Sequence, residues 1–200
     1  MLNPLRRGID FQPNIKLNGN TLDVTDQVRL VGFVLNHDLS WNSNTESLVN
    51  RAYQKMWILR RLKTMGATKK VMRLIYFQHI RSILEFGVAA WNSAITLNES
   101  KKLERVQKVA LRLIYGRIFS YTALLKTAKL CKLSKRREKL CLEFAKKAAQ
   151  HPKFKDWFKQ VNVGQPKNRA KYAVTLSRLK RLEKSPIPYL TNLLNKNNGY

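Results

Sequence analysis

Four basic side chains recur along one predicted helix at a spacing that places them on the same face. The helix is expected over residues 99–115, and its cations stand at relative positions 0, 4, 7 and 11: Lys101, Arg105, Lys108 and Arg112. At about 100° per residue these positions fall within roughly 60° of arc, and the line that they form is about 16 Å long. The apolar residues fall on the opposite side: Leu103, Val106, Ala110, Leu113 and Ile114. Such a line is suited to neutralising phosphates, and a solvated helix face is the alternative interpretation.

A second group of cations opens the next long predicted helix. Lys135, Arg136 and Arg137 follow Ser134, at the start of a helix expected over residues 134–150. Cations at a helix N-terminus oppose the helix dipole, so their placement indicates a role other than helix stability. Contact with phosphates is one such role. Solvation or pairing with carboxylates at the turn is the alternative.

The acidic residues do not form a catalytic set. Two-metal phosphoryl transfer needs clustered carboxylates to hold Mg²⁺, whereas no two of the 12 acids in this chain are adjacent. We expect Glu85, in an apolar segment, to pair with Arg81 at i,i+4 rather than to act in catalysis. The two cysteines and three histidines lack zinc-ligand spacing. We therefore predict no catalytic residue, no metal site and no cofactor in this chain, and no enzyme activity of the chain alone.

The net charge of +27 is unevenly distributed along the chain. Residues 1–45 carry no net charge, residues 46–116 carry +10 and residues 117–200 carry +17. Such a surface implies a polyanionic partner, with nucleic acid first and an acidic membrane surface second. The basic helices lack a broad exposed Trp/Phe/Leu face, which argues against the membrane. There is no secretory signal or transmembrane segment, so we expect an intracellular protein, nuclear or cytoplasmic.

The elements that must position these cations are mainly helical. Residues 10–35 are expected to form strands, with a hairpin at Asn18-Gly19 and a third strand over 28–35. Helical periodicity predicts helices over about 44–65, 69–91, 99–115, 120–130 and 134–150, and one from Pro152 through Phe158. After Gly164 the apolar spacing is poor and prolines recur. That region is expected to be a basic, loosely ordered tail.

Two segments carry a resemblance to a known family. Leu84–Trp91 (LEFGVAAW) and Leu103–Gly116 (LERVQKVALRLIYG) resemble the region after the polymerase palm in jockey-like non-LTR retrotransposon reverse transcriptases. The family pattern is roughly Ser-x-Leu-Glu-Tyr/Phe-Gly, a Trp, then Leu-Glu-x-x-Gln-x-x-Ala-x-Arg. Leu133–Arg137 also matches a Leu-x-x-Arg-Arg element of that family. The resemblance covers about residues 10–160 and is strongest over 82–150.

A weaker match lies ahead of these motifs. Leu30-Val31-Gly32 resembles the aromatic-Leu-Gly element of the primer grip, with Leu in place of the aromatic residue and Val in place of Leu. At Gly32 the backbone of a nucleic acid could approach closely, since glycine has no side chain. A strand glycine at a bulge is the alternative interpretation.

The resemblance implies a division of the chain and a function. Residues 1–42 would be a β-hairpin remnant of the palm–thumb junction, residues 43–160 a helical thumb-like domain and residues 161–200 the basic tail. The chain would position template–primer nucleic acid, an RNA–DNA hybrid or DNA duplex, through phosphates. The catalytic aspartates and their Mg²⁺ would belong to a palm that is absent here and is a possible partner. Two alternatives stay open: an independent basic nucleic-acid-binding protein derived from a degenerate element, and a non-functional translated remnant.

Overall fold

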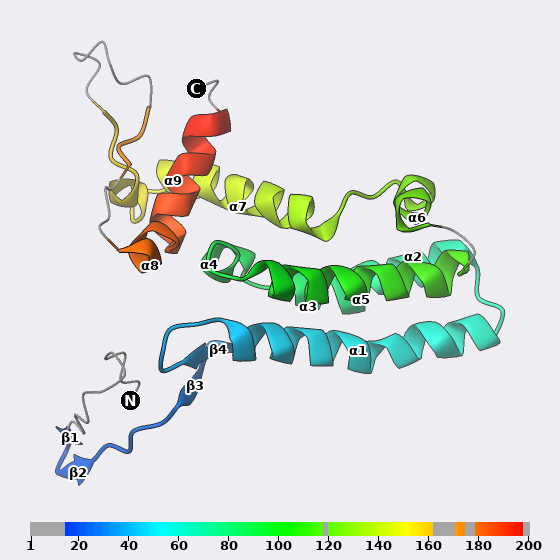
Figure 1. Cartoon of the computed structure of the whole chain (residues 1–200), viewed down its shortest axis with the longest axis horizontal. Coiled ribbons are helices and arrows are strands. Elements are labelled where there is room, and N and C mark those ends of the chain that lie inside the picture. Colours follow the sequence, from blue (N-terminus) through cyan, green and yellow to red (C-terminus); the bar gives the residue numbers. More distant parts are fainter. Residues whose placement is uncertain (1–14, 118–119, 162–170, 175–178, 198–200) are drawn as a thin grey trace.

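Two short antiparallel hairpins precede the helices in the computed structural model, which describes residues 15–117, 120–161, 171–174 and 179–197 (Figure 1). Strands β1 (Lys16–Leu17) and β2 (Asn20–Thr21) pair across Asn18-Gly19, which confirms the predicted hairpin. Strands β3 (Gln27–Leu30) and β4 (Phe33–Asn36) pair in a second hairpin. The predicted strands over residues 10–14 lie outside the described residues.

The predicted continuous strand over 28–35 is wrong, because the chain reverses in the middle of it. Val31 and Gly32 both have positive φ, 48° and 86°, and form the two-residue turn between β3 and β4. A β-branched residue rarely adopts this conformation, so Val31 carries no turn signal that sequence patterns could reveal.

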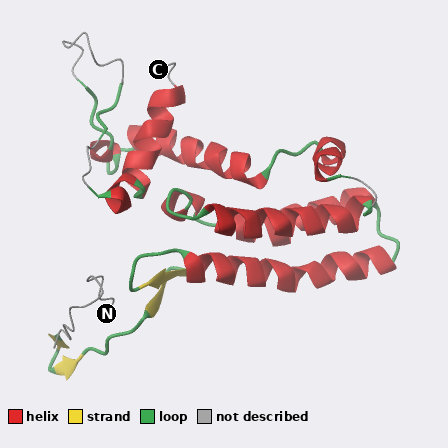
Figure 2. Ribbon diagram, viewed as in Figure 1, coloured by secondary structure: helices red, strands yellow, loops and turns green. Residues whose placement is uncertain are grey.

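Helices make up most of the remaining described chain (Figure 2), and the predicted mainly α class is confirmed. In order they are α1 (Asn42–Thr64), α2 (Lys69–Ile75), the π-helical turn η1 (Tyr76–Arg81), α3 (Ser82–Glu85), α4 (Val88–Trp91), α5 (Leu97–Tyr115), α6 (Tyr121–Ala128), α7 (Leu133–Gln150), the 3₁₀ turn η2 (Lys155–Trp157), α8 (Lys180–Glu183) and α9 (Pro186–Asn197). Helix α1 packs along α5, α5 also contacts α6 and α7, and α7 contacts α4 and α9. Apolar side chains of α1, α5, α7 and α9 share one buried cluster, and those of α6 form a smaller cluster with Leu111.

The predicted helix over 69–91 is interrupted by a turn at Phe86-Gly87, between α3 and α4. Gly87 has a φ of 55°, which glycine adopts at little steric cost. A Cβ at this position would lie 2.1 Å from the Phe33 ring, so only glycine leaves room for β4 against the helix. The Phe33 ring also lies 5.1 Å from the Phe86 ring, centroid to centroid. The second hairpin is therefore anchored on the bundle.

The expectation of a loosely ordered tail is wrong for residues 186–197, which form α9. Pro186 is the first residue of this helix, a position where the missing N–H costs nothing. Leu190, Leu193 and Leu194 join the main buried cluster. The expectation also fails at Tyr172, which joins the same cluster, and at Lys180–Glu183, which form α8. Residues 162–170, 175–178 and 198–200 lie outside the described residues.

Candidate nucleic-acid interface

Helix α5 has a well-defined start and one buried face. The Thr96 side chain accepts a hydrogen bond from the Glu99 N–H, and the Glu99 carboxylate accepts one from the Thr96 N–H. This reciprocal capping box fixes the first turn. Four of the five predicted apolar-face residues are buried, whereas Leu113 is half-buried. Leu111, which faces a separate cluster under α6, completes the buried side.

The opposite side of α5 is a groove that contains all four predicted cations. Its lining residues are Lys101, Glu104, Arg105, Lys108, Val109, Arg112 and Tyr121, and its volume is about 550 Å³. We call it the α5 groove. Lys101 and Arg105 are exposed, and Lys108 and Arg112 are half-buried. The structure therefore brings together the four residues that the helical spacing placed on one face.

The cations of the α5 groove are not neutralised by the described part of the protein. Among the described residues, no carboxylate lies within 4.0 Å of Lys101, Arg105, Lys108 or Arg112. By contrast, their neighbour Lys102 points elsewhere and pairs with Glu46 at 3.2 Å. Open cations along one groove can exchange their counterions for phosphates.

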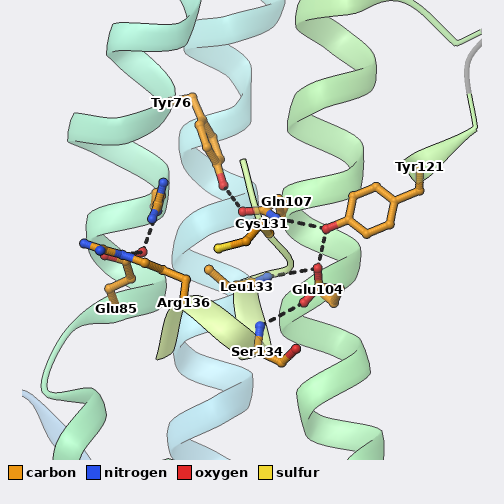
Figure 3. A network of polar contacts seen from close by, with 10 residues as sticks. Tyr76, Glu85, Glu104, Gln107, Tyr121, Cys131, Leu133, Ser134 and Arg136 are labelled. Atoms are coloured by element: carbon orange, nitrogen blue, oxygen red, sulfur yellow. Dashed lines mark hydrogen bonds and ion pairs between the residues drawn. The ribbon is translucent and has the colours of Figure 1, made fainter. Parts of the chain in front are cut away.

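Glu104, the one acid in this lining, is held by three donors from the chain itself (Figure 3). It accepts hydrogen bonds from the Tyr121 hydroxyl, from the Leu133 N–H at 3.0 Å and from the Ser134 N–H at 3.2 Å. Helix α7 has no side-chain cap of its own, so Glu104 satisfies its first N–H groups from α5. Burial, and then the hydrogen bond to Glu104, raise the pKa of Tyr121.

Gln107 extends this network into the core (Figure 3). Its Oε1 accepts a hydrogen bond from the Tyr76 hydroxyl at 2.7 Å. Its Nε2 donates to the Tyr121 oxygen at 2.9 Å and to the Cys131 carbonyl at 3.1 Å. Burial raises the pKa of Tyr76, which therefore stays a neutral donor. One amide thus ties η1, α6 and the segment before α7 to the buried side of α5.

The family-like motifs have structural roles in this network. In the Leu-Glu-x-x-Gln-x-x-Ala-x-Arg pattern, Glu104 and Gln107 are the network residues and Arg112 lines the groove. Sequence reasoning missed the roles of Glu104, Gln107 and Tyr121. The i,i+3 spacing of the first two was the available signal, since it places them near each other on one helix.

The second cation group is mostly engaged within the protein. Lys135 is exposed, as a phosphate contact would require. Arg136 lies 3.3 Å from the Glu85 carboxylate, which Arg81 also contacts at 2.5 Å. The predicted Arg81–Glu85 pair is confirmed, and so is carboxylate pairing for one cation at the start of α7.

Arg137 is an interior residue and not the exposed cation predicted at the start of this helix. Its exposed fraction is 1%. Its Nε donates to Asn92 Oδ1 at 2.9 Å, and its Nη2 donates to Ser100 Oγ at 2.7 Å. Its guanidinium carbon is 5.9 Å from the centroid of the Trp91 ring. The side chain therefore joins α7 to the α4–α5 connection. Burial lowers the pKa of this guanidinium.

The primer-grip-like residues lie apart from the α5 groove, at the turn of the second hairpin. Leu30 is 57% exposed and Val31 is 80% exposed. A Cβ on Gly32 would be 3.3 Å from the Phe86 ring, so this turn packs closely on the bundle. The structure gives Gly32 a turn position rather than the bulge considered from the sequence.

Clusters of metal ligands and membrane-spanning helices are both absent from the described ranges. No group of three or more His, Cys, Asp or Glu side chains is arranged to hold a metal ion there. Within the same ranges, no helix has the length and apolar character needed to cross a membrane.

A helical bundle with an open row of cations defines a candidate nucleic-acid-binding protein. The chain is similar to a Drosophila melanogaster protein named "Probable RNA-directed DNA polymerase from transposon BS". The two are 29% identical over 104 residues, which are 50% of this chain and 11% of that protein. No family model matches the sequence, and no solved structure matches significantly. The similarity supports a reverse-transcriptase-like origin in a transposable element.

Proposed function

We propose that this chain is the thumb-side part of a jockey-like non-LTR retrotransposon reverse transcriptase and positions template–primer nucleic acid through phosphate contacts. The observation that carries this proposal is the α5 groove, where four cations face outward without carboxylate partners among the described residues. The similarity to a transposon polymerase supplies the class of ligand. In this proposal the four cations contact phosphates and not base edges, so binding is sequence-tolerant and favours a hybrid or duplex by shape.

The proposal includes a palm domain as partner, since the chain spans only 11% of the length of the relative that it matches. The second hairpin is the proposed contact. Leu30, Val31 and Phe86 are exposed apolar side chains around its turn. Covering them would remove apolar surface from water, which favours association. The palm would also hold the Mg²⁺ that the chemistry needs.

Catalysis is assigned to that partner and not to this chain. Purified chain given template, primer, Mg²⁺ and nucleotides should not extend the primer, because no carboxylate pair is available in its sequence. Primer extension that copurifies with the chain and is lost on mutation of its own acids would contradict this assignment.

The decisive experiment measures how affinity for an RNA–DNA hybrid depends on salt. If about four phosphates are neutralised, log K should fall against log salt with a slope of about −4. Arg105→Ala/Lys108→Ala should weaken binding to all sequences alike and reduce the slope by about two.

The matched control is Lys146→Ala/Lys147→Ala, which removes the same charge from exposed positions of α7 outside the groove. It should keep most of the wild-type slope. Equal losses in the two double variants would mean that net charge alone, and not the α5 groove, determines binding.

A further inference from the structure

A second cavity lies at the other end of the α5–α7 junction. It is bordered by the connection before α5, the first turn of α7 and the residues leading into α9, and its volume is about 930 Å³. We call it the junction cavity. Its lining includes Asn92, Ser100, Lys135, Arg137 and Lys184. It shares no lining residue with the α5 groove, so its properties can be tested separately.

The charge of Arg137 at this cavity has no carboxylate in direct contact, and only the more distant Glu104 and Glu85 balance it within the described protein. Two of its nitrogens donate to neutral oxygens, those of Asn92 and Ser100. Its Nη1 is buried and has no hydrogen-bond partner, and no described carboxylate lies within 4.0 Å of the guanidinium. An arginine keeps its proton at neutral pH, and a buried charge is costly unless it is paired. An anion in contact with the guanidinium would give Nη1 a partner and the charge a close counter-ion.

The surroundings of Arg137 also favour an anion. Lys135 and Lys184 line the same cavity and are exposed, so their ammonium groups can turn toward a ligand. Glu138 is the one acid in this lining, against three cations.

We propose that the junction cavity binds a phosphoryl group, carried either by inorganic phosphate or by the end of a nucleic-acid strand. The Arg137 guanidinium supplies a planar donor whose orientation Asn92 and Ser100 fix, and the two lysines supply mobile charge around it. Arginine in this role suits a tetrahedral oxyanion because its donors form a rigid fork. This site does not depend on nucleic-acid binding by the α5 groove.

The test is a titration of the intact chain with inorganic phosphate, at constant ionic strength maintained with chloride. A ligand that binds the folded state raises Tm in a saturable manner. Lys135→Ala/Lys184→Ala should weaken the apparent phosphate affinity at least tenfold. The control Lys146→Ala, at an exposed position of α7 outside the cavity, should leave it unchanged. No saturable rise, or the same response in all three proteins, would overturn the proposal.

Two further variants show whether the phosphate occupies the junction cavity or the α5 groove. Arg137→Gln should abolish the rise of Tm with phosphate. If this variant does not fold, the result for Lys135→Ala/Lys184→Ala decides the test. Arg105→Ala/Lys108→Ala should keep the full rise of Tm with phosphate. If this variant loses the rise, phosphate binds in the α5 groove and the proposal is overturned.

Oligonucleotides with a 5′-phosphate or a 5′-hydroxyl distinguish the source of the phosphoryl group. If only the phosphorylated strand competes with inorganic phosphate, the ligand is a strand end. If neither strand competes, the ligand is the free anion.

Discussion

The α5 groove and the first turn of α7 look alike in the sequence and differ in the structure. Both are clusters of cations on long helices, yet the groove cations have no carboxylate partner among the described residues while Arg136 and Arg137 are engaged internally. The difference follows from spacing. Cations at i, i+4, i+7 and i+11 share one face, whereas three consecutive residues point about 100° apart and cannot all face solvent. A periodic row of cations is thus a better indicator of a solvent-facing charged surface than a consecutive run.

The largest expected effect is that of Arg137→Ala on stability. The substitution would remove the buried side chain and leave the Asn92 and Ser100 oxygens without their donor. We expect a loss of about 3–5 kcal/mol in the free energy of unfolding, because two buried oxygens lose their donor and the truncated side chain leaves a cavity. Urea denaturation followed by circular dichroism measures it. A loss below about 1 kcal/mol would place Arg137 with the surface cations after all.

Glu104→Gln should have an intermediate effect: it should lower the stability of the fold and raise the affinity for a duplex. Glutamine has a single acceptor oxygen, so one of the Leu133 and Ser134 N–H groups or the Tyr121 hydroxyl would lose its partner. We expect a loss of about 1–3 kcal/mol in stability. Affinity for a duplex at low salt should rise, since the acid in the groove lining is removed. A fall in affinity of the folded variant would show that Glu104 orders the groove.

The smallest effects should be those of Arg136→Ala and Arg105→Ala. Arg136 is partly exposed and Glu85 keeps Arg81 as partner, so its loss should cost no more than about 1 kcal/mol. Arg105 is exposed in the groove, and its substitution should change stability by less than about 0.5 kcal/mol. Thermal unfolding of the two variants side by side measures the difference. If Arg105→Ala destabilises the protein more than Arg136→Ala does, Arg105 is the internally engaged cation and Arg136 the solvent-facing one, contrary to the structure.

Local sequence signals predict the parts of the fold that depend on neighbours in the chain. Asn18-Gly19 marks a hairpin, and the face of α5 follows from periodicity alone. Contacts between distant segments are not accessible in this way. The Phe33 ring fits against Gly87, and these two residues lie far apart in the sequence. Because the contact that requires glycine is distant, a glycine within an apolar helical run gives no sign that the helix breaks there.

The same limit accounts for the errors at the candidate site and at the C-terminus. The burial of Arg137 depends on Asn92 and Ser100, which lie far from it in the sequence. The prolines of this region favour a loose tail, although Ser185 followed by Pro186 is also a helix-start signal. A proline is compatible with the first turn of a helix, and only the packing of Leu190 shows that this helix exists.

The anchoring of the α6 region on α5 restricts how this protein can change in length during evolution. Glu104 and Gln107 stand on one rigid helix and hold Tyr121 at one end of the segment and Cys131 and Leu133 at the other. An insertion or deletion between these ends would displace one set of partners. Related chains should therefore vary in length before Tyr121 or beyond α7, and keep a constant spacing from Tyr121 to Leu133.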